Sequence, residues 1–280
     1  MEPSDDQRFT EVTLTGGFVS PVAKVGDTVR RGTGPWPPAV HALLNHLEDV
    51  DFDGAPRVLG TDGRGREVLS FVPGEVPDHA SPEVATEGVL AQVGRLLRRY
   101  HDAVHGFELP TGIRWHHRPI PGDETVVCHN DISPRNTVFR DARPVAFVDW
   151  DLATPAPPAW DVAHAAWQFV PLADDAGCRR HGWPAPPDRA HRLRVLCDGY
   201  GLTDADRAGF SALVARRIET TASGIEELAA RGVAAHERLV RIGIPALVRA
   251  DGAWVGLHAG ELDAALVPKG GRRSHNSRAT

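Results

Sequence analysis

Short apolar runs alternate with polar and turn-forming residues in the N-terminal part of the chain, which is the pattern of a small antiparallel sheet. Residues 18–31 contain a glycine–aspartate pair at 26–27 between two such runs, and this predicts a β-hairpin. Residues 57–60 and 66–72 predict two more strands around a glycine-containing turn. Between the hairpin and these strands, residues 37–47 begin with proline and repeat apolar side chains at helical spacing. One helix is therefore expected to cross the sheet.

Helical spacing dominates the rest of the chain. The Ser81-Pro82 pair, an N-cap residue followed by proline, predicts the start of an amphipathic helix that ends near Gly106. Further helices are predicted over residues 160–169, 188–201, 204–231 and 244–266. We therefore expect an α+β protein in which a small, mainly-β lobe with one crossing helix precedes a larger, mostly helical lobe.

The boundary between the lobes is expected at the Pro73-Gly74 pair, which breaks regular structure. The sequence then divides into an N-terminal lobe at residues 1–75 and a C-terminal lobe at residues 76–267. Residues 268–280 are basic and rich in glycine and serine, and we predict a disordered tail there.

Composition excludes several classes of protein. With 280 residues, 41% of them hydrophobic, the chain can bury a sizeable core. Its net charge of -6, with no basic run outside the C-terminal tail, excludes a nucleic-acid partner. The N-terminus resembles no signal peptide, and no apolar stretch approaches the roughly 20 residues needed to cross a membrane, so we expect a cytoplasmic protein without a membrane partner. The oligomeric state cannot be inferred from the sequence.

The stretch 126–151 carries the clearest candidate chemistry. An apolar run is followed by a polar loop with Asp131 and Asn136, and a second apolar run ends at Asp149. This pattern predicts several oxygen ligands at adjacent strand ends, which is a site suited to magnesium and phosphate. Phosphoryl transfer to a hydroxyl needs a carboxylate that orients the nucleophile and accepts its proton, together with metal ligands for the phosphates.

This stretch has two alternative interpretations. Asp131 and Asn136 alone would more readily be interpreted as a turn-stabilising pair on a surface loop. The flanking apolar runs and the later acids favour a functional site instead. A thiol nucleophile with an adjacent base at Cys128-His129 is disfavoured, because neighbours in an extended strand point to opposite faces.

The motif His129-x-Asp131-x4-Asn136 resembles a motif of a known family. Together with the segments 147–151 and 158–163, it resembles the aminoglycoside phosphotransferase and choline kinase group of small-molecule kinases, whose fold is protein-kinase-like. A weaker likeness extends over about residues 12 to 265. The resemblance implies ATP or GTP and magnesium as cofactors, Asp131 as the catalytic base, and Asn136 and Asp149 as the magnesium ligands.

The same resemblance assigns supporting roles around the base. His129 orients the catalytic loop, and Asp161 is the buried acid that binds the backbone of that loop from the following helix. Asp151 lies on the same face as the metal acid in an extended segment, so it either ligates through water or caps the next turn.

Kinases of this fold hold the nucleotide phosphates with a lysine on the third strand, and the chain has only Lys24 and Lys269. Lys24 follows Gly17 too closely to leave room for a complete second strand. Arg30 lies at a better distance, and a guanidinium fork binds phosphate oxygens well. Arg31 is the alternative, since a shift of one residue in register turns every side chain over.

Two segments of the first lobe would contact the nucleotide by the same likeness. Gly17 and Ser20 belong to a glycine turn at the position of the phosphate-binding loop, although its sequence is not GxGxxG. Backbone groups near Ser70, Phe71 and Val72 would bind the base, and the sequence does not distinguish adenine from guanine there.

The helix at 37–47 departs from the family pattern. It carries His41 where the acid that pairs with the phosphate-binding cation is expected, and Glu48 lies two turns further on. This departure leaves a second hypothesis open, a nucleotide-binding pseudokinase or interaction module without transfer activity. The preferred hypothesis is a kinase acting on a hydroxyl of an antibiotic, sugar, amino alcohol or nucleoside. Residues 174–267 contain 13 acidic and 12 basic residues, which does not support a polycationic acceptor.

Overall fold

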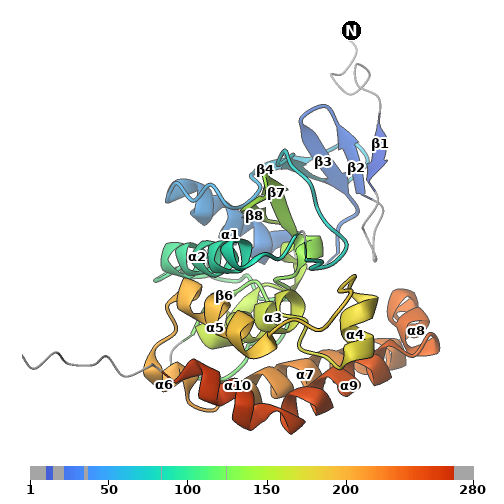
Figure 1. Cartoon of the computed structure of the whole chain (residues 1–280). Helices are drawn as coiled ribbons and strands as arrows, with labels where there is room; N and C mark the ends of the chain where they lie inside the picture. The colour runs from blue at the N-terminus through green and yellow to red at the C-terminus, as the bar shows by residue number, and fades with distance from the viewer. Residues whose placement is uncertain (1–10, 15–21, 35–36, 83, 124, 268–280) are drawn as a thin grey trace, which may run out of the picture.

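The chain folds into a small sheet-containing part and a larger helical part, as the computed structural model in Figure 1 shows. The structure describes residues 11–14, 22–34, 37–82, 84–123 and 125–267. The predicted α+β class, with a small antiparallel sheet before a mostly helical lobe, is confirmed. The lobe boundary at residue 75 stays a prediction, and the tail at 268–280 lies outside the described residues.

The sheet has five antiparallel strands in the order β1-β2-β3-β5-β4. Their bounds are Val12–Leu14 (β1), Val22–Val25 (β2), Thr28–Arg31 (β3), Val58–Thr61 (β4) and Glu67–Ser70 (β5). The predicted two-residue turn joins β2 to β3, with Gly26 at a φ of 58° that a glycine adopts without strain. In the pairing of β3 with β5, Arg31 lies directly opposite Glu67. This register places two charged side chains on one face of the sheet.

Helix α1, Pro37–Asp49, is the helix predicted between the strands. Its apolar side chains repeat every three or four residues, and the four that the periodicity predicts are buried: Val40, Leu43, Leu44 and Leu47. They belong to one hydrophobic cluster that continues into the helical part of the chain. The small sheet therefore shares its core with the larger part instead of building its own.

Helix α2, Glu87–Ala103, begins later than the Ser81-Pro82 pair predicts. The hydroxyl of Thr86 accepts the backbone N–H of Val89 at 3.3 Å and caps the helix, and Glu87 occupies its first turn. The carbonyl of Ser81 instead accepts the N–H of Ala85 in a turn. The sequence offers two capping residues, and tertiary packing selects the second.

Helices α2 and α5 (Arg189–Tyr200) cross closely at two glycines. A Cβ atom on Gly94 would lie 2.6 Å from backbone atoms of α5, and one on Gly199 would lie 2.5 Å from the carbonyl oxygen of Ala91. Only residues without a side chain permit this approach. The crossing holds Tyr100 at the far end of α2, where its hydroxyl donates to the carbonyl of Val127 at 2.6 Å.

The remaining helices divide more finely than the sequence predicts. Where one helix was expected from 204 to 231, Gly209 at a φ of 70° separates two, and His258 separates another two within 244–266. The bounds are Pro158–Phe169 (α3), Asp175–Arg180 (α4), Asp204–Arg207 (α6), Phe210–Ala230 (α7), Ala234–Arg241 (α8), Ile244–Leu257 (α9) and Ala259–Leu266 (α10). The apolar pattern of the sequence does not predict α4 or α8. In the part of the chain that the structure describes, no helix combines the length and apolarity needed to cross a membrane.

Two short strand pairs frame the stretch 126–151. Strand β6 (Val126–Cys128) pairs with β9 (Thr154–Ala156), and β7 (Thr137–Arg140) pairs with β8 (Arg143–Phe147). Single 3-10 turns lie between them, η2 at Pro134–Asn136 and η3 at Trp150–Leu152. The loops that follow β6 and β8 are therefore adjacent, as the sequence pattern predicts.

Candidate active site

The loop after β6 is held in a strained conformation by its own side chain. Asn130 has a φ of 65°, in the left-handed region that asparagine tolerates better than most residues. Its side-chain amide lies 3.1 to 3.2 Å from three carbonyl oxygens, those of Cys128, Leu152 and Thr154. These hydrogen bonds offset the backbone strain and join the loop to β9.

Asp161 on α3 holds the same loop through hydrogen bonds to its backbone. Its two carboxylate oxygens accept the backbone N–H groups of His129 and Asn130, each at 2.7 Å. The Nε2–H of His101 donates to it at 3.2 Å. Burial favours the neutral acid, but the hydrogen bonds from His101 and from the backbone N–H of Asn130 lower the pKa of Asp161 below its ordinary value. These contacts are the ones that a loop-supporting acid requires.

A group of metal-ligand type forms around this acid, comprising His101, Cys128 and Asp161. All three are buried, and their hydrogen-bonding atoms are in use. The hydroxyl of Tyr200 donates to Nδ1 of His101 at 2.8 Å, while burial raises the pKa of the Cys128 thiol well above its ordinary value. A neutral thiol is a poor metal ligand. We interpret the group as a hydrogen-bonded support of the loop.

The side chain of Asp131 is 36% exposed, whereas those of Asn136 and His164 beside it are buried. Its Oδ2 accepts the amide N–H of Asn136 at 2.7 Å, and its Oδ1 lies 3.2 Å from Nε2 of His164 on α3. Although burial raises it, the pKa of Asp131 is lowered overall by His164, His129 and Arg217. The carboxylate is therefore ionised, held at Oδ2 by Asn136 and partly exposed to solvent.

His129 joins the two loops of the site. Its Nδ1 accepts the backbone N–H of Asp131 at 3.2 Å, so its Nε2 carries the proton and donates to the carbonyl of Val148 at 3.0 Å. Burial lowers the pKa of His129, which keeps the ring neutral. Its ring packs against Trp150 at 4.5 Å between centroids. These contacts suit an orienting residue, not one that touches the reacting atoms.

Asn136 and Asp149 present oxygen ligands side by side. The amide nitrogen of Asn136 donates to Asp131, at 2.9 Å to the carbonyl and 2.7 Å to the carboxylate, so its oxygen faces away from that residue. The N–H of Val148 donates to the carbonyl of Asn136 at 2.9 Å and brings the two segments together. Asp149 has a φ of 65° and a side chain 53% exposed. An amide oxygen and an accessible carboxylate suit magnesium, a hard cation that prefers oxygen.

The structure places Arg31, not Arg30, against these acids. Nη1 of Arg31 donates to Oδ1 of Asp149 at 2.9 Å, and Nη2 donates to Oδ1 of Asp151 at 2.6 Å. Arg30 is on the opposite face of β3, with its guanidinium 3.8 Å from Asp62. Asp151 therefore pairs with the arginine of the other lobe, a contact that neither of its predicted roles anticipates.

The acid expected on α1 is supplied by strand β5. Oε2 of Glu67 accepts Nε–H of Arg31 at 2.5 Å, and Oε1 accepts Nε2–H of His41 at 2.6 Å. Sequence reasoning missed Glu67. Its signal was present in the pattern of the two strands, since β3 and β5 neighbour each other and a charged residue within an apolar strand requires a partner.

Two further residues near the base were also missed. His164 follows Asp161 by three positions on α3, so both lie on one helix face, and this spacing could have pointed to it. Arg217 on α7 donates from Nη2 to the carbonyl of Asn130 at 2.6 Å. No sequence signal connects α7 to the loop, because the contact spans 87 positions.

The nucleotide-binding segments are described only in part. Gly17 and Ser20 lie outside the described residues. The N–H groups of Ser70 and Phe71 donate to the carbonyls of Arg57 and Asp27, each at 2.9 Å. These two N–H groups are therefore engaged within the sheet region, and base binding by Ser70, Phe71 and Val72 stays a prediction.

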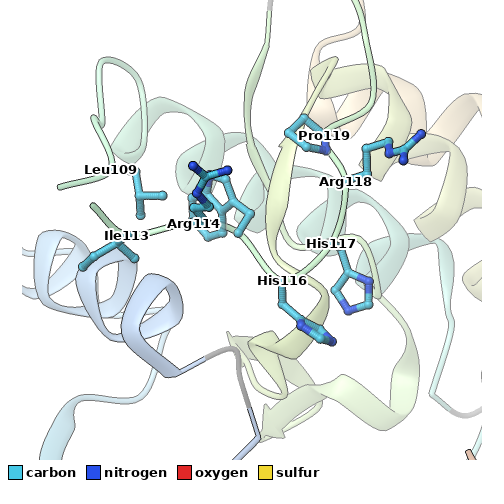
Figure 2. A pocket seen from close by; sticks show the side chains of 8 residues that line it. Leu109, Ile113, Arg114, His116, His117, Arg118 and Pro119 are labelled. Carbon is cyan, nitrogen blue, oxygen red and sulfur yellow. The ribbon is translucent and has the colours of Figure 1, made fainter. Parts of the chain in front are cut away.

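A separate depression of about 470 Å³ lies on the loop between α2 and β6 (Figure 2). Its lining contains none of the residues predicted for the site: Leu109, Ile113, Arg114, Trp115, His116, His117, Arg118 and Pro119. Burial lowers the pKa of His117 to about 4, so this ring is neutral. We assign the depression no role in the chemistry.

Two sequence comparisons match this chain to known proteins. The model of a family described as "Phosphotransferase enzyme family" matches residues 105–193. The trifolitoxin immunity protein of Rhizobium leguminosarum bv. trifolii is 40% identical over 205 residues, which cover 71% of this chain and 77% of that protein.

Solved structures share the fold at lower identity. A microcompartment-associated aminopropanol kinase aligns with a TM-score of 0.59 and 14% identity, over 91% of this chain and 94% of that one. The GDP complex of aminoglycoside 2'-phosphotransferase-IIIa aligns with a TM-score of 0.58 and 14% identity, over 89% of this chain and 94% of that one. A choline/ethanolamine kinase family protein from Mesorhizobium loti aligns with a TM-score of 0.54 and 18% identity, over 94% of each chain. The chain belongs to the phosphotransferase enzyme family and shares its fold with an aminoglycoside phosphotransferase and a choline/ethanolamine kinase family protein.

Proposed function

We propose that the chain transfers the γ-phosphate of ATP or GTP to a hydroxyl group of a small molecule. The observation that carries the proposal is the state of Asp131, an ionised carboxylate held at Oδ2 by Asn136 and accessible to solvent. A base for an alcohol must be within hydrogen-bond reach of the hydroxyl, and this carboxylate is open on the side away from its supports. Family membership supports the same reaction class.

In the proposed reaction, Asp131 orients the acceptor hydroxyl and accepts its proton. The O–H bond breaks as the oxygen forms a bond to the γ-phosphorus, and the nucleoside diphosphate leaves. Asn136 and Asp149 are the residues that would hold magnesium, and magnesium, when bound, neutralises charge on the phosphate oxygens. Arg31 takes the phosphate-binding role, because its guanidinium lies at Asp149 while that of Arg30 does not.

The rival hypothesis, a pseudokinase, rested on His41 occupying the position on α1 where the acid is expected. Glu67 supplies that acid from the neighbouring strand, with both of its oxygens in short hydrogen bonds. The geometry therefore favours an enzyme over a binding module.

The acceptor is proposed from the relative's name and from the charge balance. A protein named for immunity to a toxin fits a kinase that phosphorylates that toxin, since a phosphate adds almost two negative charges and a new bulky group to a binding surface. The near-equal number of acids and bases in residues 174–267 points away from a polycation. Hydroxyl-bearing toxins and antibiotics of low charge are the first acceptors to test.

The test is a transfer assay on the full chain with ATP or GTP, magnesium and a panel of hydroxyl compounds, measuring nucleoside diphosphate and phosphorylated product. We expect one acceptor class to stimulate release and Asp131→Asn to abolish it with an unchanged melting temperature. Asp123→Asn, a matched change at an exposed position, serves as the control. Normal activity in the Asp131 variant would overturn the role of the base. Nucleotide binding without transfer to any acceptor would favour the pseudokinase.

A further inference from the structure

Three residues from three elements are linked by hydrogen bonds beside the proposed phosphate site. Arg31 on β3 and Glu67 on β5 are direct cross-strand partners, and His41 on α1 reaches the same carboxylate. Glu67 is 1% exposed and Arg31 9% exposed. A buried carboxylate is stable only when its oxygens are paired, and here one oxygen has the guanidinium and the other the imidazole. The pairing is therefore built into the fold.

The charge state of Glu67 follows from these contacts. Burial raises the pKa of a carboxyl group, yet the hydrogen bond from His41 and the charge of Arg31 lower the pKa of Glu67 below its ordinary value. Glu67 is thus ionised at neutral pH. Glu67 accepts the hydrogen bond from Nε of Arg31. The two terminal nitrogens of the guanidinium are then directed toward Asp149 and Asp151 of the other lobe.

We propose that Glu67 is the positioning residue for the phosphate-binding cation, and that His41 joins helix α1 to that pair. The inference rests on the proposed function, because it concerns how the same site binds the nucleotide phosphates. Protein kinases take this acid from the helix, and the position of the helix controls their activity. In this chain the acid comes from the sheet, so alignment of the arginine does not depend on where α1 lies.

Strand β5 gives this arrangement a second consequence. Glu67 is the first residue of β5, and Ser70 is the last and also the first residue of the predicted base-binding hinge. One short strand, hydrogen-bonded to β3 and β4, therefore carries both the anchor of the phosphate cation and the start of the hinge. The distance between base and phosphate contacts is fixed by sheet geometry, and the site is assembled without a helix movement.

The experiment measures nucleotide binding by the full chain, not transfer. Calorimetric titration with magnesium-ATP and magnesium-GTP is compared with titration of adenosine and guanosine, which lack phosphate. Glu67→Gln keeps the shape of the side chain and removes its charge. We expect at least a tenfold loss of triphosphate affinity with less than a twofold change for the nucleoside, about the effect of one charge-assisted hydrogen bond.

A rescue separates positioning from simple structural support. His41→Glu in a Glu67→Ala background returns an acid from the helix, where family members carry it, and should recover most of the affinity that Glu67→Ala loses. Glu48→Gln on the same helix, an acid paired with Arg57 at 3.4 Å and 40% exposed, is the matched control and should bind like wild type. Melting temperatures of all variants are recorded.

Several outcomes would overturn the inference. These are triphosphate affinity unchanged in Glu67→Gln, equal losses for nucleoside and triphosphate, or a rescue variant no better than Glu67→Ala. If wild-type protein binds the nucleoside triphosphate but transfers its γ-phosphate to no acceptor, the proposed function is refuted. This inference still stands in that case if Glu67→Gln weakens triphosphate binding. Wild-type protein that binds no nucleotide would refute both.

Discussion

Replacing Asp161 by asparagine should destabilise the protein strongly while preserving the shape of the side chain. Asp161 is fully buried, accepts two backbone N–H groups at 2.7 Å and receives a third hydrogen bond from His101. Asparagine keeps one accepting oxygen and turns an NH2 group toward a backbone donor. One charge-assisted hydrogen bond is lost, and a buried N–H is left without an acceptor.

The magnitude follows from those two losses. A hydrogen bond to a charged group contributes about 1.5 to 3 kcal/mol, and an unsatisfied buried donor costs about 1 to 3 kcal/mol. We expect the free energy of unfolding to fall by about 3 to 5 kcal/mol. At about 2 to 4 °C per kcal/mol for a domain of this size, the melting temperature should fall by roughly 10 °C.

The assay is urea unfolding and calorimetry at pH 7, with Asp123→Asn as the exposed control. The pKa of Asp161 is lower in the folded protein, so its contribution to stability is present above the ordinary aspartate pKa and is lost as pH falls through the folded value. The difference between wild type and variant should therefore shrink below about pH 4. A variant within about 1 kcal/mol of wild type at pH 7 would refute the reasoning.

Three further predictions concern other parts of the molecule. Arg31→Ala should weaken magnesium-ATP or magnesium-GTP binding at least tenfold, as measured by calorimetry, whereas Arg30→Ala should change it less than threefold; equal effects would contradict the assignment to Arg31. Burial raises the pKa of Asp251 to about 6, against the hydrogen bond from Trp167, so stability should fall as pH rises from about 4 to 6. Asp251→Asn removes this loss and should raise the free energy of unfolding by up to about 3 kcal/mol at pH 8 but little at pH 4, as shown by urea unfolding at both values. Gly94→Ala places a methyl group 2.6 Å from the backbone of α5 and should lower the free energy of unfolding by about 1 to 3 kcal/mol, and an unchanged midpoint in urea would show that the helices can separate without loss.

Hydrophobic periodicity was sufficient to predict the main elements. The hairpin at 26–27, the stripe of α1 and the apolar strands around the catalytic loop were predicted because their side chains repeat at the period of the structure they form. Errors arose where two local signals competed. Ser81 and Thr86 are both residue types that favour helix N-caps, but only Thr86 caps α2 in the structure. Gly209 and His258 interrupt stretches that the apolar pattern predicts as single helices.

Some residues of the candidate site were predicted from the sequence, whereas others depend on strand pairing. Asp131, Asn136 and Asp149 are close in sequence and follow apolar runs, so the sequence alone brought them together. Which arginine faces them could not be predicted, since Arg30 and Arg31 differ only by strand register, and register depends on pairing with β5.

What the sequence determined about this protein is therefore the local part: a carboxylate, an amide and a second acid on two adjacent loops. What only the tertiary structure decided is the set of partners brought from a distance. Glu67 lies 36 positions from Arg31, His164 lies 33 positions from Asp131, and Arg217 lies 87 from Asn130. Each contact depends on sheet order or helix packing, which no local pattern of residues specifies, and together these contacts position the groups of the proposed site.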